Sequence, residues 1–135
     1  MIKPTLCAVA ESVSVDGETN VTSILGLLEQ IQAESFPVLM QRMTFIVFYV
    51  RDAGDPTELR GEFTVTIGNQ TIVMQAVNVK FLDTLRTRVV VKLVGMTIPQ
   101  PGKLKFRLAL SGVDDAESET EITAMAPKIQ QMPTH

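Results

Sequence analysis

Apolar side chains recur at every second residue along much of this chain, a period that is typical of β-strands and not of helices. The alternation is cleanest over residues 103–110. There one face carries Leu104, Phe106, Leu108 and Leu110, and the other carries Lys103, Lys105, Arg107 and Ala109. We expect the first face to lie on a core and the second in solvent. A phosphate-binding stripe along the three basic residues is the alternative for the second face.

Turn residues separate this strand from several others of the same kind. Gly68-Asn69 lies between two β-type runs, residues 62–67 and 70–81, and this arrangement predicts a hairpin. Further strands are expected over residues 6–15, 43–51, 88–98 and 119–125. Seven or eight short strands at roughly even spacing predict an all-β fold, namely an antiparallel β-sandwich of Ig-like or jelly-roll-like type.

One segment, residues 21–32, fits two different structures. Helical spacing relates Ile24, Leu27, Leu28 and Ile31, and Asn20 could serve as the N-cap of such a helix. Gly26 would weaken the helix by about 1 kcal/mol relative to alanine. The segment also fits an interrupted strand, which is the interpretation we favour. A helix near residues 21–32 would instead make the fold α+β.

The chain is expected to form one domain on its length of 135 residues. A domain of this size buries roughly two-thirds of the surface of its unfolded chain, enough to fold without disulfides or metal. We expect residues 1–126 to form this single domain. Residues 127–135 contain two prolines and no apolar run, and they are predicted to form a loose C-terminal tail.

Charge and hydropathy exclude several classes of partner. The net charge of −3 and the pI near 5.1 give no electrostatic reason to expect a nucleic acid or an anionic membrane as partner. The longest strongly apolar stretch, residues 44–50, is far shorter than the roughly 20 residues that span a bilayer. No targeting signal is visible, so a cytoplasmic location is expected.

Motifs for nucleophilic, metal or phosphate chemistry are absent from the sequence. The single cysteine, Cys7, and the single histidine, His135, stand at opposite ends of the chain. They support neither a zinc site nor a cysteine–histidine pair. There is also no phosphate-binding glycine loop and no nucleophile elbow. We therefore expect no cofactor and no enzymatic activity.

Carboxylates are the remaining candidates for chemistry, and they gather in two segments that we expect to be loops. The first segment holds Asp52 and Asp55, and the second holds Asp114, Asp115 and Glu117. Calcium prefers several carboxylate oxygens on a flexible loop, so these five residues are candidate calcium ligands. Paired carboxylates could alternatively act as the acid and base of an enzyme. Neither segment has the spacing of an EF-hand.

The order of turns and strands also carries a resemblance. It rests on Asp16-Gly17, Ile24-Leu25-Gly26, Ser35-Phe36-Pro37, Gly61-x-Phe63-x-Val65 and Pro101-Gly102-x-Leu104-x-Phe106, within residues 5–125. In this order the chain resembles a family of small uncharacterised bacterial proteins, a domain of unknown function. The resemblance implies a β-sandwich and a strand within residues 21–32. It implies no activity and no catalytic residue.

These observations together predict a protein-binding module that self-associates, with a homodimer as the commonest form. A mean hydropathy of +0.20 fits a domain that hides further surface in an oligomer. Exposed sheet edges also invite strand addition by another chain. Two alternatives stay open: a structural subunit of a phage-like or secretion assembly, and a calcium-binding or carboxylate-based enzyme domain.

Overall fold

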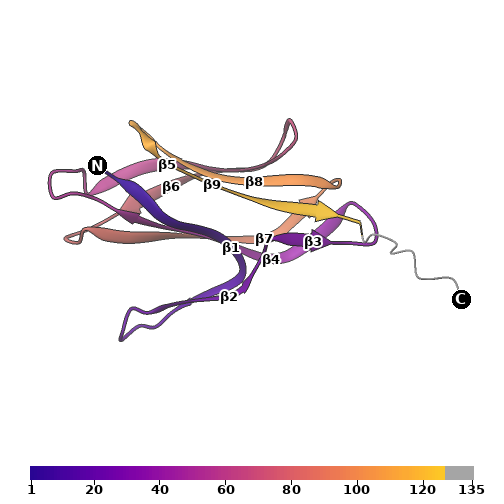
Figure 1. The fold of residues 1–135 in the computed structure, drawn as a ribbon, viewed down its shortest axis with the longest axis horizontal. Coiled ribbons are helices and arrows are strands. Elements are labelled where there is room, and N and C mark those ends of the chain that lie inside the picture. The colour runs from indigo at the N-terminus through magenta and orange to yellow at the C-terminus, as the bar shows by residue number, and fades with distance from the viewer. Residues whose placement is uncertain (127–135) are drawn as a thin grey trace, which may run out of the picture.

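The computed structural model describes residues 1–126, and in this part of the chain the regular secondary structure consists of strands alone. The nine strands of residues 1–126 are β1 (Lys3–Val15), β2 (Thr22–Leu27), β3 (Gln30–Gln32), β4 (Val38–Val50), β5 (Glu58–Ile67), β6 (Gln70–Lys80), β7 (Arg86–Ile98), β8 (Gly102–Leu110) and β9 (Val113–Met125) (Figure 1). The all-β class is thereby confirmed. The predicted tail, residues 127–135, lies outside the described residues.

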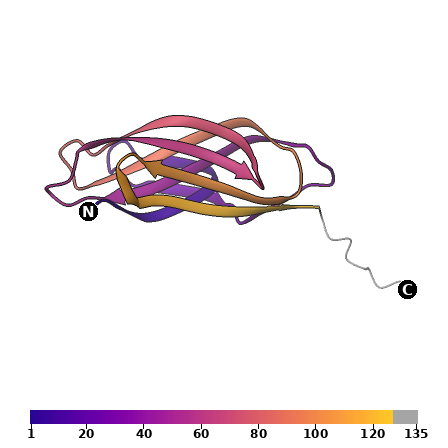
Figure 2. The same cartoon turned by 90° about the horizontal axis from the view of Figure 1, so that it is seen from above.

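The strands form two facing sheets, so the predicted β-sandwich is confirmed (Figures 1 and 2). Sheet A has the order β2-β1-β4-β7, and sheet B has the order β3-β9-β8-β5-β6. All strand pairs are antiparallel except β3 with β9, a departure from the purely antiparallel sandwich that we predicted. The orders β1-β4-β7 and β9-β8-β5 correspond to A-B-E and G-F-C of an immunoglobulin domain, so the topology is Ig-like.

The inward faces of the two sheets make one hydrophobic core. Strand β8 contributes Leu104, Phe106 and Leu108, which have no exposed surface, as their alternation predicted. From the opposite sheet, the ring of Phe45 packs against that of Phe63, with centroids 4.8 Å apart. Burial of such side chains supplies most of the driving force for folding, because each contributes about 1.5–3 kcal/mol.

Residues 21–32 form two strands, so the strand prediction was right and the helix alternative was wrong. Gly26 has a φ of +69° and Asn20 a φ of 61°, values that a right-handed helix does not contain. The chain leaves β2 in sheet A and enters β3 in sheet B after only two residues. This crossing splits one predicted strand into two and raises the count from the predicted seven or eight to nine.

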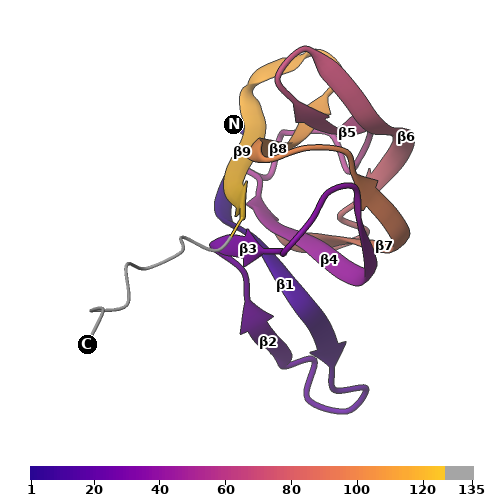
Figure 3. The ribbon, with the colours of Figure 1, turned by 90° about the vertical axis from the view of Figure 1, so that its right-hand side faces the viewer.

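The crossing also explains the parallel pair, since β3 reaches sheet B beside the end of β9 and runs in the same direction (Figure 3). The chain then returns to sheet A through Phe36-Pro37, whose peptide bond is cis. Strands β1 and β3 thus belong to different sheets, and residues 16–29, which include β2, connect them.

Candidate protein-binding surface

Asp52 and Asp55 lie together, as their loop predicted, but their carboxylates already have partners. The N-terminal ammonium group of Met1 forms ion pairs with both, at 2.7 Å from Asp55 Oδ2. Asp55 Oδ2 also accepts a hydrogen bond from the backbone N–H of Asp52 at 2.8 Å. These bonds, chiefly that from the ammonium group, hold the pKa of Asp55 below its ordinary value. The arrangement closes a turn by pairing opposite charges.

The second acidic segment is not a loop, and the prediction of one was wrong. Residues 113–125 form β9, which pairs with β8. The side chains of Asp114 and Asp115 lie outside what the structure describes. Glu117 forms an ion pair with Arg107 on β8. Cross-strand pairs of opposite charge stabilise a sheet, so an acid-rich run is stable as a strand beside a basic one.

The pairing of β8 with β9 also engages the basic residues of β8, Lys103, Lys105 and Arg107, which we considered as a phosphate-binding stripe. Besides the Arg107–Glu117 pair, Lys105 Nζ lies 3.8 Å from Glu121 Oε1. Two of the three cations that could have bound phosphate therefore face carboxylates on the neighbouring strand. Among the side chains that the structure describes, which do not include those of residues 114–116, no three Asp, Glu, Cys or His side chains gather so that they could hold a metal ion.

Cys7 and Tyr49 lie on neighbouring strands, and burial raises the pKa of both. The pKa of the half-buried Cys7 thiol is raised to about 11, so little of the nucleophilic thiolate form exists at neutral pH. Burial likewise raises the pKa of Tyr49 to about 12. The Tyr49 hydroxyl shares a buried hydrogen bond of 2.9 Å with Ser118 Oγ. This bond joins β4 of sheet A to β9 of sheet B and serves the fold.

We predict that Tyr49→Phe lowers the free energy of unfolding by about 1–2 kcal/mol, because it leaves the buried Ser118 hydroxyl without this partner. Urea unfolding followed by circular dichroism measures the loss. The double variant Tyr49→Phe/Ser118→Ala removes both polar groups and should regain part of it. If the double variant lost more free energy of unfolding than the two single variants together, this explanation would be contradicted.

A hairpin made of residues 11–27 forms a separate feature, which we call the arm. Strand β1 pairs with β4 only from Lys3 to Ala10, and from Ala10 to Val15 it pairs with β2 on its other edge. At that point β1 bends, and its second half with β2 leaves the two layers of the sandwich (Figures 1 and 3). The arm thus lies between the part of β1 that pairs with β4 and the short strand β3.

The arm has a well-defined local structure. The predicted turn at Asp16-Gly17 is confirmed, and the Asp16 carboxylate accepts hydrogen bonds from the backbone N–H groups of Glu18 and Thr19. At the tip, Arg88 of β7 donates a hydrogen bond of 2.8 Å to Asn20 Oδ1. The arm is therefore tethered to sheet A at both ends.

Apolar side chains of the arm are exposed where a core strand would bury them. Val21 is 59% exposed, Leu25 56% and Leu27 60%. No residue of the arm belongs to the hydrophobic core. Within the described part of the chain, the outer edge of β2 pairs with no other strand. An isolated two-stranded hairpin is at best marginally stable in water. A partner that covered this surface would therefore stabilise the arm.

A groove lies beside the base of the arm, between β1 and β9. It has a volume of about 630 Å³. The groove is lined by Leu6, Cys7, Ala8, Val9, Ile24, Leu27, Leu28, Glu29, Thr120 and Glu121. Apolar side chains predominate, and the two glutamates are the only charged groups in this lining.

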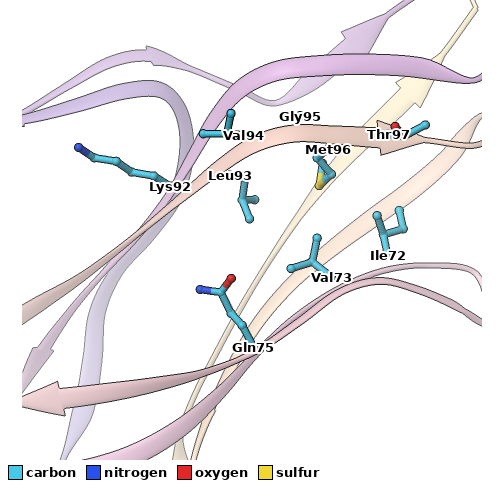
Figure 4. A pocket seen from close by; sticks show the side chains of 9 residues that line it. All are labelled: Ile72, Val73, Gln75, Lys92, Leu93, Val94, Gly95, Met96 and Thr97. Carbon is cyan, nitrogen blue, oxygen red and sulfur yellow. The ribbon is translucent and has the colours of Figure 1, made fainter.

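A second hollow, of about 590 Å³, lies on the opposite side of the sandwich between β6 and β7 (Figure 4). Ile72 and Val73 of β6 face Leu93 and Met96 of β7 across it. Both strands are irregular here: β6 has a register shift beside Val73, and Gly95 in β7 has a φ of +71°. Such irregularities make a strand edge a poor template for pairing.

Sequence reasoning missed the arm, because the run from Val21 to Leu27 has the apolar character of a core strand. Of the candidate carboxylates in the two acidic segments, Asp55 and Glu117 lie at different places with different partners. The signal that could have found the arm was the Asp16-Gly17 turn next to an apolar run that contains a glycine.

Comparison with known proteins gives a family but no function. No curated protein matches the chain. Among the described residues, no helix has the length and apolar character needed to cross a membrane. One family model, described as a family of unknown function, matches residues 5–123, which is most of the chain. The expected membership of such a family is thereby confirmed: the chain belongs to the family of unknown function DUF6941.

Proposed function

We propose that this protein is a non-catalytic interaction module that self-associates through the outer edge of β2. The observation that carries the proposal is the exposed apolar surface of the arm, which contributes nothing to the core. An apolar surface on a protruding element marks an interaction site in a soluble domain. The ion pairs that already engage Asp52, Asp55 and Glu117 fit a non-catalytic module.

A second copy of the chain is the partner that suits this edge. The sequence of β2, Thr-Ser-Ile-Leu-Gly-Leu, contains no charged residue and no proline. Antiparallel pairing of two identical strands therefore brings no like charges of β2 together. It would satisfy the outward backbone groups of both copies and join two four-stranded sheets into one.

The other edges of the described sheets are less suited to such pairing. Strand β3 has only three residues. The edges of β6 and β7 are interrupted by the register shift and by Gly95, and β7 also carries Arg86, Arg88 and Lys92. Charge and irregularity are the usual means by which a sheet edge avoids pairing. The edge of β2 carries no charge and is longer than that of β3, and it shares with β7 one glycine of positive φ, Gly26 at +69°.

We expect Leu25→Lys to weaken self-association at least about tenfold. Full burial of a leucine contributes about 1.5–3 kcal/mol, roughly half of the Leu25 side chain is exposed, and a symmetric dimer contains two copies. Light scattering coupled to size-exclusion chromatography over a concentration series measures the change.

The matched control is Met74→Lys, which places the same charge at a residue of sheet B that is 64% exposed. This control should associate like the wild type. A wild-type protein that is monomeric at all concentrations would overturn the proposal. A dimer that Met74→Lys disrupts as strongly as Leu25→Lys would overturn the assignment to β2.

A further inference from the structure

Charged residues are distributed unequally between the two sheets. The chain as a whole has 15 acidic and 12 basic residues. Strands β5, β8 and β9 of sheet B carry charges of both signs. In sheet A, residues 3–10, β4 and β7 contain no acidic residue, and their charged residues are Lys3, Arg42, Arg86, Arg88 and Lys92. Outside the arm, sheet A is therefore positively charged in a chain whose net charge is negative.

The cations of β7 lie on the face of sheet A that points away from sheet B. Val89, Val91 and Leu93 point into the core. Because side chains alternate along a strand, the residues between them and next to them point outward. Figure 4 shows Lys92 and Val94 directed away from the hollow between β6 and β7, and Leu93 directed into it. Arg42 of β4 pairs with Val94 and extends the row. We call the outward residues Arg42, Arg86, Arg88, Val90, Lys92 and Val94 the basic strip.

The cations of the basic strip have no acidic partner within the described side chains, where no carboxylate forms an ion pair with them. Arg88 donates its hydrogen bond to the neutral amide of Asn20. In the same turn, the Asp16 carboxylate is engaged by backbone N–H groups. On sheet B, in contrast, Lys105 and Arg107 face glutamates of the neighbouring strand. Like charges close together repel one another, so an anionic partner would relieve a repulsion that the domain leaves uncompensated.

The side chains of the basic strip indicate the chemistry of that partner. Three of its four cations are arginines, whose planar guanidinium groups bind carboxylates in a bidentate manner. Apolar side chains stand among them, and Val94 is 82% exposed. A partner that matches this surface carries carboxylates together with apolar side chains.

The arm favours a narrow partner over a large polyanion. It projects from the outward side of sheet A, the side on which the basic strip lies (Figures 1 and 3). Its charged residues, Glu11, Asp16 and Glu18, are all acidic. A membrane or a long nucleic acid that approached this side would meet the acidic arm first. An extended protein segment is narrow enough to lie along β7 beside the arm.

We propose that the basic strip binds an extended acidic segment of a partner protein through side-chain contacts. Side chains on one face of an extended chain are about 7 Å apart, so the two chains match residue for residue. The segment carries acidic residues opposite Arg86, Arg88 and Lys92, and apolar residues opposite Val90 and Val94. It binds the face of β7 and not the strand edge, and this site is separate from the outer edge of β2.

The probe is the fluorescein-labelled peptide Gly-Glu-Thr-Glu-Thr-Val-Thr-Glu-Thr-Val-amide, in which the glutamates and valines follow the order of the basic strip. Fluorescence anisotropy at low ionic strength measures its binding to the full-length protein. A control peptide has glutamine in place of each glutamate. It should bind about tenfold more weakly, which is the effect expected for the loss of three exposed ion pairs. Equal binding of the two peptides, or no binding at millimolar protein, would overturn the proposal.

On the protein, Arg86→Glu/Lys92→Glu should weaken peptide binding about tenfold or more, since it replaces two attractions by two repulsions. The matched control is Arg60→Glu/Lys103→Glu, which changes the net charge equally at two exposed residues on the outer face of sheet B. This control should keep most of the affinity, and thermal unfolding tests that both variants fold. A control as weak as the strip variant would show that net charge alone acts, and the basic strip would then not be the site.

Two competitors test other classes of partner: vesicles that contain phosphatidylserine, and a DNA oligonucleotide. Neither should displace the peptide at an equal concentration of negative charge. Displacement by either one would assign the basic strip to anions in general and overturn its assignment to a protein segment. Leu25→Lys should lose the dimer and keep the affinity for the peptide, so failure of this proposal and failure of self-association can be told apart.

Discussion

Phe63→Ala is expected to lower the free energy of unfolding by about 3–5 kcal/mol, a large part of the stability of an ordinary domain. Phe63 is fully buried in β5 and packs against Phe45 of the opposite sheet. Its truncation removes apolar contacts and leaves a cavity between two sheets that cannot collapse freely. The melting temperature should fall by on the order of 10–15 °C, as measured by differential scanning calorimetry.

A double-mutant cycle with Phe45→Ala tests whether the ring pair itself contributes. The centroids are 4.8 Å apart and the rings are tilted by 46°, a favourable arrangement for aromatic side chains. We expect a coupling energy of about 0.5–1.5 kcal/mol. Met74→Ala, at an exposed position of sheet B, is the control and should change the melting temperature little. A loss for Phe63→Ala no larger than that of this control would contradict the description of the core.

The sequence predicted the elements that are buried on one face only. The alternation of β8 follows directly from a core on one side and water on the other, so it could be read from residues 103–110 alone. Strand β9 was predicted too short, because its first half is stabilised by a pairing that composition does not reveal. The Glu117 carboxylate finds Arg107 only once the hairpin forms.

The candidate site could not be predicted for a related reason. The partner of Asp52 and Asp55 is the N-terminal ammonium group, which is remote in sequence. The sequence alone does not show whether such a partner lies beside a carboxylate, so a paired carboxylate and a free one are equally good calcium candidates at that level. Likewise, the apolar residues of β2 look like core residues in the sequence, and only the bend of β1 places them in solvent.

Arg51→Met is expected to lower the free energy of unfolding by about 2–4 kcal/mol, because one buried guanidinium joins two loops. Arg51 is 8% exposed and lies directly after β4. It donates hydrogen bonds to the backbone carbonyls of Thr84, Asp52 and Asp55 at 3.0–3.3 Å. Each buried carbonyl left without its donor costs about 1–3 kcal/mol, reduced here where water can reach the site.

The guanidinium also lies over the ring of Phe81, 5.6 Å from its centroid, a contact that contributes about 0.5–1 kcal/mol. Lysine has one compact ammonium group and cannot direct donors to three carbonyls at once, so Arg51→Lys should recover less than half of the loss. Arg86→Met, at an exposed residue of β7, is the control and should lie within about 0.5 kcal/mol of the wild type. Urea unfolding of the three variants measures these differences. If Arg51→Lys were as stable as the wild type, the planar arrangement of donors would not be what joins the loops, and charge alone at this position would suffice.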